Sequence, residues 1–458
     1  MSTAPLKPNP YDLTQGSIAH HLYRLTLPMV WALMANFIVQ ATDMWFISML
    51  GADELAAMGF AFPIMMLVFS LSIGLSAGVA SVVSRFAPIK SAHDMRCLVT
   101  DALFLCFILG VFLAAIGLMT IDEVFSLIGA DERLVPIICD YMEIFYLNNI
   151  ITMVAMNGLS AVRALGDSKA QASSMIAAAV VNLVLDPIFI FGLGGFPRLE
   201  LQGAALATSF ARVVTLAIAL RVIIFQKHLL VWPSLQWQRL KSSWQPLLHI
   251  ALPAAGTNMI IPLSGAIITT ILATYGEYAV AGMGVAMRIE PLLLICFYAM
   301  SSIISPFVGQ NVGVHDFDRI YRSVRMSCQF SLALGLVLAA IVFIFSDSVI
   351  QAFTQDESTI AVARNYLMIV SLSYGAAGVV MIVNASFNGM AKPLQATLMS
   401  VIRVIILYLP FAYILSYYFQ EIGIFMAYSL VNMICAVVGY MWFLRTAKRL
   451  CMPLRCER

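Results

Sequence analysis

Several stretches of this chain are long enough to cross a membrane as helices and contain no charged residue. The windows without Asp, Glu, Lys or Arg include 55–84, 242–276, 326–346, 365–391 and 422–444. A helix needs about 20 predominantly apolar residues to cross the hydrocarbon core of a bilayer. Every backbone polar group of such a segment must be satisfied internally in lipid, which a helix achieves. The chain is therefore predicted to cross a membrane several times as helices.

Composition supports a membrane location and excludes one class of partner. Of the 458 residues, 61% are hydrophobic and only 11% are charged, whereas soluble domains carry about 25% charged residues. The 26 Lys and Arg nearly balance the 24 Asp and Glu. No basic excess is left to neutralise phosphates, so nucleic acid is not an expected partner. The expected partner is the lipid bilayer.

Twelve spans are predicted when apolar runs that hold a single charge are included. Alternate loops between them differ in charge, and 20 of the 26 Lys and Arg fall at the chain ends and in the even-numbered connections. Because basic residues collect on the cytoplasmic side, both termini are predicted to be cytoplasmic. The fold class is an all-α integral membrane protein, with spans near 25–50, 54–84, 97–119, 134–162, 169–192, 201–226, 246–273, 278–308, 320–346, 362–389, 394–418 and 422–445.

The two halves of the chain repeat each other. Pro28 aligns with Pro253 at an offset of 225 residues, and Gly166 aligns with Gly389 at an offset of 223. Each half holds six spans, so both have the same orientation in the membrane. Parallel repeats of this kind occur in secondary transporters, where a cavity between two lobes opens to each side in turn. We expect a pseudo-twofold along the membrane normal between an N-lobe (1–228) and a C-lobe (246–458), joined by a cytoplasmic linker (229–245).

Acidic residues inside the spans are the first candidates for function. An ionised acid at the centre of a membrane helix costs about 2.5–3.5 kcal/mol on insertion scales. Asp43 follows Asn36 and Gln40 at spacings that place all three on one helix face, and Asn182 lies one turn before Asp186. Asn36 and Gln40 either line a substrate path or bond between helices.

Several candidate residues are predicted to lie at the same depth in the membrane. With a helical rise of about 1.5 Å per residue, Asp43, Asp186, Thr208 and Tyr141 each lie roughly 9–11 Å below the outer surface. Two carboxylates with neighbouring amide and hydroxyl oxygens suit an exchangeable proton or a small hard cation such as Na⁺. No other metal is expected. The alternative is that these acids are satisfied by neighbouring groups and only fix helix packing.

The other charges in the spans have no assigned role. Glu290 and Arg288 are predicted to face different sides of one helix, and Glu290 either pairs with Arg403 or Arg212 or contacts substrate. Asp101 lies one turn from the inner edge of its span and is predicted to reach the lipid headgroups.

Absent motifs narrow the source of energy. The chain contains no Gly-Lys dipeptide, hence no phosphate-binding loop and no ATPase site, and it contains no HExxH motif. Its six His lie in loops or at span ends, so a histidine base within the membrane is not expected. These features argue against an enzyme and against a bound cofactor, and they favour transport driven by an ion gradient.

Four features together resemble the MATE family of multidrug and toxic compound extrusion antiporters. They are Pro28 in the first span, Asp43 near its outer end, RALGDSK at 163–169 and NLVLDP at 182–187. The resemblance implies export of drug-like, often cationic amphipathic compounds in exchange for H⁺ or Na⁺, by a monomer in the bacterial inner membrane. Carried over by motif, the family's cation site falls on Asp43, Asn182, Asp186, Thr208 and Tyr141, and its bending proline on Pro28.

One departure bears on the coupling ion. The Na⁺-coupled NorM-type branch carries acids in spans 7 and 10, whereas 254–270 and 370–388 hold none here. The chain thus resembles the DinF-type branch, which favours H⁺ and leaves Na⁺ open. A flippase for lipid-linked precursors is the alternative, although it would need several basic residues in its cavity. A major-facilitator carrier would show a GxxxDRxGRR-like inner loop, which 84–96 lacks.

Overall fold

The computed structural model describes residues 12–129, 131, 133–232 and 236–451. These residues are nearly all helical, and none of them forms a β-strand. The predicted all-α class is confirmed. The predicted cytoplasmic position of the two chain ends depends in part on 1–11 and 452–458, which lie outside the described residues.

The chain folds into two compact units. Among the described residues, the N-terminal unit contains 12–17 and Tyr23–Leu252, and the C-terminal unit contains Ile18–Leu22 and 253–451. Each unit has its own apolar core. Phe125 and Ile138 are fully buried in the first core, and Tyr374 is fully buried in the second.

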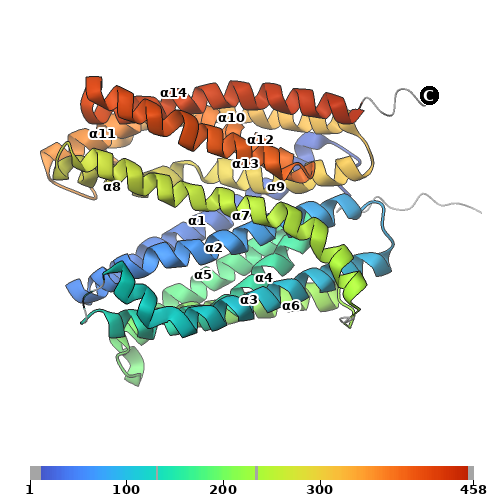
Figure 1. Ribbon diagram of the computed structural model, residues 1–458, viewed down its shortest axis with the longest axis horizontal. Coiled ribbons are helices and arrows are strands. Elements are labelled where there is room, and N and C mark those ends of the chain that lie inside the picture. Colours follow the sequence, from blue (N-terminus) through green and yellow to red (C-terminus); the bar gives the residue numbers. More distant parts are fainter. Residues whose placement is uncertain (1–11, 130, 132, 233–235, 452–458) are drawn as a thin grey trace, which may run out of the picture. The chain divides into compact units, whose positions relative to one another are not determined.

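Six long helices build the N-terminal unit (Figure 1). Each of them covers most or all of one of the first six predicted spans, although α1 and α3 extend well beyond the predicted edges. A π-helix, η2 (Arg221–Gln226), prolongs the sixth, and a short 3₁₀ turn, η1 (Leu193–Gly195), follows the fifth. The helices are α1 (Ile18–Ser48), α2 (Ala52–Phe86), α3 (Ala92–Ile128), α4 (Val135–Ala164), α5 (Ser168–Phe191) and α6 (Glu200–Leu220).

Local sequence explains where two of these helices begin and end. The Ser91 hydroxyl accepts the Asp94 N–H at the start of α3, and the Asp167 carboxylate caps α5 in the same way. Such caps satisfy backbone N–H groups that have no partner inside the helix. Gly129 (φ 88°) and Gly192 (φ 73°) then end α3 and α5 in the left-handed region, which glycine adopts without strain.

The helices that follow η2 are interrupted more often than those before it. The helix α7 (Trp237–Ala273) passes through the division between the units, and it begins inside the segment predicted as a linker. A π-helix, η3 (Ile402–Tyr408), interrupts the last part of the chain. The helices of the C-terminal unit are α8 (Glu277–Leu293), α9 (Ile295–Gly313), α10 (Phe317–Ile350), α11 (Glu357–Ser371), α12 (Tyr374–Gly389), α13 (Pro393–Val401) and α14 (Leu409–Cys451).

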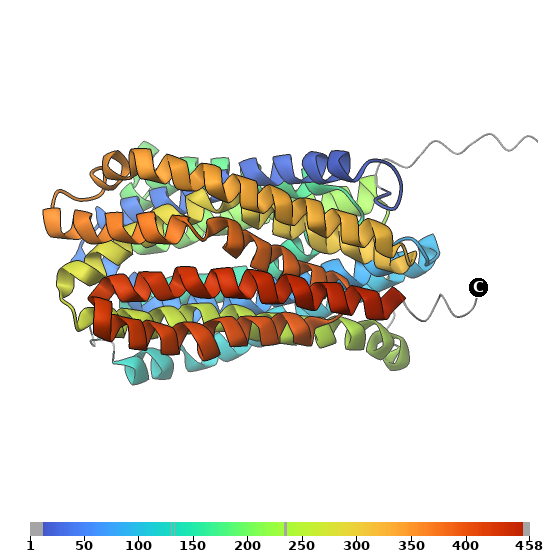
Figure 2. The same cartoon turned by 90° about the horizontal axis from the view of Figure 1, so that it is seen from above.

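The number of membrane crossings agrees with the prediction. Among the described residues, nine helical segments are long and apolar enough to cross a membrane, or eleven when each bent helix pair is taken as one span. One of the nine, Pro393–Leu450, has 58 residues, about 87 Å at 1.5 Å per residue, which is enough for two crossings. Its backbone turns at Gln420 (φ 53°, ψ −139°), and the two parts of α14 lie side by side in Figures 1 and 2. Counting each bent pair as one span and this long segment as two gives the predicted twelve spans.

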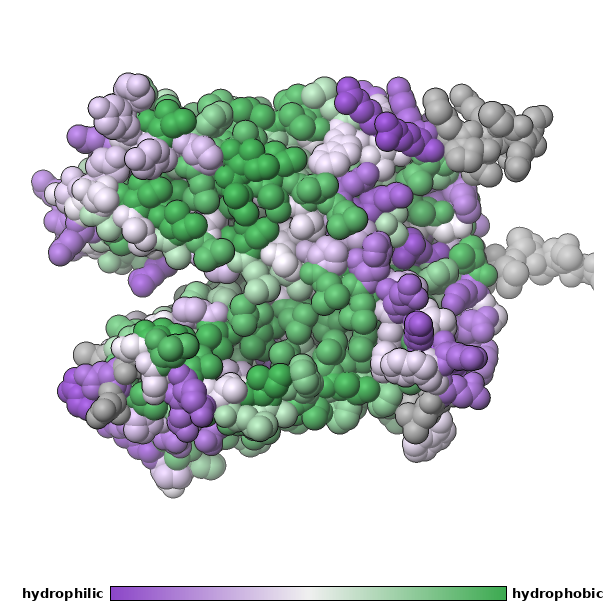
Figure 3. Space-filling model, viewed as in Figure 1, coloured by the Kyte–Doolittle hydropathy of each residue, from purple (hydrophilic) through white to green (hydrophobic). Residues whose placement is uncertain are grey.

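Hydrophobic side chains cover the middle of the helices. Figure 3 shows them in green along the centre of each unit, with hydrophilic residues concentrated toward the helix ends. Exposed apolar side chains include Leu336 (73%) and Ile344 (72%) on α10. Large exposed apolar surfaces mark membrane or protein contacts, and here they lie on helices long and apolar enough to cross a bilayer. The chain is thus an integral membrane protein with multiple spans.

The prediction that Asp101 reaches the lipid headgroups is wrong. Asp101 is fully buried, and both of its carboxylate oxygens bind Arg239 of α7, at 3.1 and 3.3 Å. The Ser243 hydroxyl donates to the same carboxylate at 2.7 Å, and the Trp244 indole N–H donates to the Asp101 carbonyl at 2.8 Å. The first turns of α7 are therefore tied to α3, and the carboxylate is held inside the protein.

Substitution of Asp101 with Asn is expected to destabilise the protein by about 2 kcal/mol. Removing one partner of a buried ion pair costs roughly 3–5 kcal/mol, and we expect less here because the Arg239 side chain is 28% exposed. Thermal unfolding in detergent measures the effect. Asp140→Asn is the matched control, since Asp140 is exposed in the same unit. Equal unfolding temperatures for the two variants would contradict the prediction.

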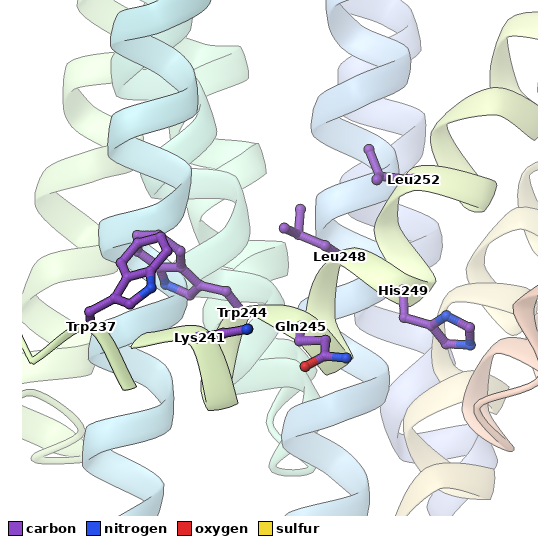
Figure 4. Close-up of a pocket in the computed structure, with 7 residues that line it drawn as sticks. All are labelled: Trp237, Lys241, Trp244, Gln245, Leu248, His249 and Leu252. Atoms are coloured by element: carbon purple, nitrogen blue, oxygen red, sulfur yellow. The ribbon is translucent and has the colours of Figure 1, made fainter. Parts of the chain in front are cut away.

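A shallow pocket of about 420 Å³ lies along the N-terminal part of α7. Its lining is mainly aromatic and apolar, and Figure 4 shows Trp237 and Trp244 next to each other at one end. The lining residues are Trp237, Lys241, Trp244, Gln245, Leu248, His249 and Leu252. None of the predicted site residues contributes to this pocket, so the candidate site has to be identified from its side chains.

Candidate functional site

The predicted acids of the N-terminal unit come from two helices. Asp43 lies on α1, in the last turns before the helix ends at Ser48. Asp186 lies on α5, directly before Pro187, and Asn182 stands one turn earlier on the same face. The Asp186 side chain is fully buried, whereas Asp43 is partly exposed.

Packing brings these acids to Tyr141 of α4 and Arg212 of α6. Asp43 and Asp186 lie within electrostatic range of each other, and Tyr141 is within range of both and of Arg212. Tyr141 is 6% exposed. Four helices thus contribute to one cluster, which contains three of the residues grouped by the depth count, Asp43, Asp186 and Tyr141. Arg212 was left without a role by the sequence, because its distance from Tyr141 depends on how α6 packs against α4.

Several buried oxygens of this cluster have no hydrogen-bond partner among the described residues. Within the described part of the chain, no group hydrogen-bonds either carboxylate oxygen of Asp186, the Oδ1 of Asp43 or the Oδ1 of Asn182, and all of these atoms are buried. A buried polar atom without a partner costs about 1–3 kcal/mol, and more when it is charged. This argues against a purely structural role, in which neighbouring hydroxyls or amides would satisfy the acids. A proton or a small cation would supply the missing interactions.

The other predicted residues are less closely placed. Thr208 stands one turn before Arg212 on α6 and is partly exposed, as is Asn36 on α1, while Gln40 is exposed. The described residues form no hydrogen bond to the side chains of Thr208, Asn36 or Gln40. Pro28 lies within α1, which stays helical through it from Ile18 to Ser48. The contacts of the N-terminal unit therefore join Asp43, Asp186 and Tyr141. Among the described residues they assign no partner to the other four predicted residues, which are Thr208, Asn36, Gln40 and Pro28.

In the C-terminal unit, Glu290 has a partner that the sequence did not indicate. The Tyr366 hydroxyl donates to Glu290 Oε2 at 2.7 Å, and Arg403 lies within electrostatic range of the carboxylate without forming an ion pair with it. Arg288, two residues earlier on α8, is exposed. Tyrosines occur throughout apolar spans, so sequence alone could not single out Tyr366.

The described residues offer no metal centre built from several His, Cys, Asp or Glu side chains. The described residues contain no group of three or more His, Cys, Asp and Glu that could hold a metal ion. The Asp43–Asp186 cluster has two carboxylates only, and any cation bound there would need neutral oxygens as further ligands.

Comparison with known proteins identifies relatives over nearly the whole chain. It is 33% identical to a protein named FAD transporter from Shewanella oneidensis, over 97% of this chain and 98% of that protein. It is 25% identical to the probable multidrug resistance protein YoeA of Bacillus subtilis, over 92% and 96%. Both relatives match at nearly full length, so the similarity is not confined to one lobe.

Solved structures share the fold. The Vibrio cholerae MATE transporter VcmN, in a structure of an aspartate-to-asparagine mutant, superposes with a TM-score of 0.88 at 27% identity, covering 94% of this chain and 97% of that one. A MATE family multidrug resistance transporter of the MOP superfamily, solved in an outward-facing conformation, gives a TM-score of 0.90 at 23% identity, with 97% and 99% covered. The two-lobe, twelve-helix fold is that of these transporters.

The family assignment rests on two matching stretches. Residues 28–188 and 253–414 each match the MatE family, and their starting points are separated by the same 225 residues as the internal repeat. The matched stretches cover more than half of the chain, and the relatives are transporters rather than enzymes. The chain belongs to the MatE family of multidrug-type membrane transporters.

Proposed function

We propose that this protein is a proton-coupled exporter of drug-like compounds. The observation that carries the proposal is the pair of neighbouring acids, Asp43 and Asp186, whose buried oxygens have no hydrogen-bond partner among the described residues. Intramembrane acids of this kind usually mark an ion pathway. In the proposed setting the protein works as a monomer in the bacterial inner membrane, with both termini in the cytoplasm.

A proton fits this pair better than Na⁺. Two carboxylates close together in a site of low polarity cannot both ionise without a large electrostatic cost, and a shared proton removes it. Asp186 is fully buried, so a bound Na⁺ would have to lose nearly all of its water. Proton uptake from outside would neutralise the pair and change its interactions with Tyr141 and Arg212. Release on the cytoplasmic side would then complete the cycle in exchange for the exported compound.

The exported compound has two candidate classes. Relatives named multidrug resistance proteins favour amphipathic, often cationic compounds. The relative named FAD transporter is 33% identical over 97% of this chain, which favours a flavin dinucleotide as the second candidate. FAD is an anion with two flat ring systems, so it would require basic and aromatic side chains rather than acids. Arg212, within electrostatic range of Tyr141, and Arg403, within range of Glu290, are two basic residues that could serve this purpose.

Reconstituted vesicles separate these possibilities. Purified protein in liposomes is given either ethidium or FAD, under a pH gradient alone or a Na⁺ gradient alone. The proposal expects ethidium transport driven by the pH gradient and unaffected by Na⁺. Transport driven only by Na⁺ would overturn proton coupling, and transport of FAD without ethidium would replace the multidrug class by the flavin class. No transport under either gradient would overturn the proposal as a whole.

Pro28 is proposed as the point at which α1 bends during the cycle. Proline removes one helical hydrogen bond and weakens the helix locally, and VcmN has been solved in a form named bent. Pro28→Ala is expected to slow transport about tenfold, a change of roughly 1.4 kcal/mol in the barrier, while ligand affinity changes less than about twofold. Transport rate and equilibrium binding of ethidium, measured on the same preparation, test this. A loss of affinity with an unchanged maximal rate would contradict the hinge role.

A further inference from the structure

A second polar cluster lies in the C-terminal unit and has no role in the proposed coupling. It is centred on Glu290 of α8, which accepts the Tyr366 hydroxyl of α11. Five tyrosines and one arginine lie within electrostatic range of the Glu290 carboxylate. They are Tyr298 on α9, Tyr366 on α11, Tyr374 on α12, Arg403 and Tyr408 on η3, and Tyr428 on α14.

The cluster has a buried side and an accessible side. Tyr366 is 5% exposed and Tyr374 is fully buried, and the Tyr366 ring packs edge-on against Phe425 with the ring centroids 5.0 Å apart. Tyr298, by contrast, is 37% exposed, and Arg403 is partly exposed. The Tyr366 hydroxyl therefore positions Glu290, while Tyr298 and Arg403 remain available to a bound molecule.

Hydrogen-bonding capacity is left unused at this site. Glu290 Oε1 and the Tyr374 hydroxyl are buried and have no hydrogen-bond partner among the described residues. Arg403 forms no ion pair within the described chain, although the carboxylate is within its electrostatic range. A cluster that served only to join helices would satisfy these groups, because each buried polar atom without a partner is costly.

The cluster also coincides with the irregular helices of the unit. The chain bends by 50° between α8 and α9, one turn after Glu290, and by 57° between α11 and α12, directly before Tyr374. Arg403 and Tyr408 belong to the π-helix η3. Interrupted helices line the binding sites of many secondary transporters, and π-helical turns are frequent at functional sites.

The fold itself does not require these charges. At the repeat offsets of 225 and 223 residues, Glu290 corresponds to Met65 and Arg403 to Val180 in the N-terminal half. Conversely, the C-terminal unit has no acid at the positions that correspond to Asp43 and Asp186. The two repeats therefore carry different chemistry at different places, which indicates separate tasks.

We propose that the Glu290–Arg403 cluster binds the flat, heteroaromatic part of the transported compound by its edge. An N–H group of that edge donates to Glu290, a C=O group of the same edge accepts from Arg403, and tyrosine rings lie alongside. This inference rests on the proposed transport function and adds a substrate class to it. A bare cation is disfavoured by Arg403 and a bare anion by Glu290, whereas a ring edge with a donor beside an acceptor satisfies both. Aromatic side chains favour flat rings by stacking or edge contacts.

Equilibrium binding of riboflavin tests the proposal without any gradient. Riboflavin presents an imide edge on a flat ring and carries no phosphate. Binding to the purified full-length protein in detergent is followed by quenching of flavin fluorescence, with ethidium as the comparison ligand. Glu290→Gln and the milder Arg403→Lys are each expected to weaken riboflavin binding about tenfold, as when a charge-assisted hydrogen bond is lost. Arg288→Gln, on the exposed side of the same helix, is the matched control and is expected to bind as the wild type does.

The outcomes are distinct. Unchanged riboflavin affinity in both Glu290→Gln and Arg403→Lys, or no saturable binding by the wild type, overturns the proposal. A loss of ethidium affinity alone would instead make the cluster an organic-cation site and overturn the ligand class. Thermal unfolding of each variant identifies misfolding, and the second variant keeps the test valid if the first does not fold. Failure of the transport function would appear as riboflavin binding with no gradient-driven transport in liposomes.

Discussion

Asp186→Asn is expected to reduce transport driven by a pH gradient to the level of liposomes without protein. Asn has nearly the shape of Asp but cannot gain or lose a proton. Asp186 is fully buried, and its two carboxylate oxygens have no hydrogen-bond partner in the described chain, so the substitution leaves the pair with a single carboxylate and no proton to share. Asp43→Asn is expected to have an equally large effect, because Asp43 lies within electrostatic range of Asp186.

The control for this prediction is a change of the same kind on a neighbouring helix. Asp140 precedes Tyr141 on α4 and is exposed, so Asp140→Asn is expected to leave transport within about twofold of the wild type, as for most surface substitutions. Export of ethidium from liposomes, loaded with equal amounts of folded protein, is the measurement. Wild-type rates in Asp186→Asn and Asp43→Asn would remove the pair from the coupling mechanism and return it to a packing role.

Gly335→Ala is expected to produce the largest loss of stability, about 3 kcal/mol. A methyl group at Gly335 on α10 would overlap the backbone nitrogen and Cα of Gly375 on α12. Backbone atoms cannot move aside as the end of a side chain can, so the helices would have to separate, and overpacking typically costs about 1–3 kcal/mol. The separation would also stretch the bond from the Ser331 hydroxyl to the Gly375 carbonyl, now 2.9 Å. Small residues allow this close approach of membrane helices.

Another helical glycine of the same unit provides the control. Gly284 on α8 has nothing within 4 Å of the position that a methyl group would take. Gly284→Ala is therefore expected to be neutral or to stabilise the helix by roughly 0.5–1 kcal/mol, since Ala has the better helix propensity. Thermal unfolding in detergent compares the two. If both variants unfold at the wild-type temperature, the tight α10–α12 contact is not important for stability.

The membrane spans could be predicted because the bilayer imposes a simple rule on sequence. A crossing helix needs a continuous apolar run of sufficient length, and the internal repeat is visible as matched residues such as Pro28 and Pro253. The bend after α8 follows Pro291, and proline commonly kinks a helix, but the break between α11 and α12 could not be predicted in this way. The bend between α11 and α12 follows Ser371, in an apolar run without a proline, because it depends on packing rather than on local composition.

The partners of charged residues show the same contrast. Counting residues along α3 placed Asp101 near the membrane edge, but its partner Arg239 lies 138 positions away. In the same way, neither the contact of Glu290 with Tyr366, 76 positions apart, nor the approach of Arg212 to Tyr141 is encoded in any local pattern. Each depends on which helices pack together and on their rotation about their axes.

The sequence by itself determined the membrane location, the twelve spans and the duplication, and it predicted a common level for Asp43, Asp186 and Tyr141. These properties depend on hydropathy and on distance along a helix, both of which are local. Only the tertiary structure decided which polar groups meet, that Asp101 is buried against Arg239, and that Glu290 and five tyrosines share one cluster. Side-chain contacts between helices join residues that lie far apart in the sequence. No periodic pattern along the chain marks such pairs, so they depend on how the helices pack.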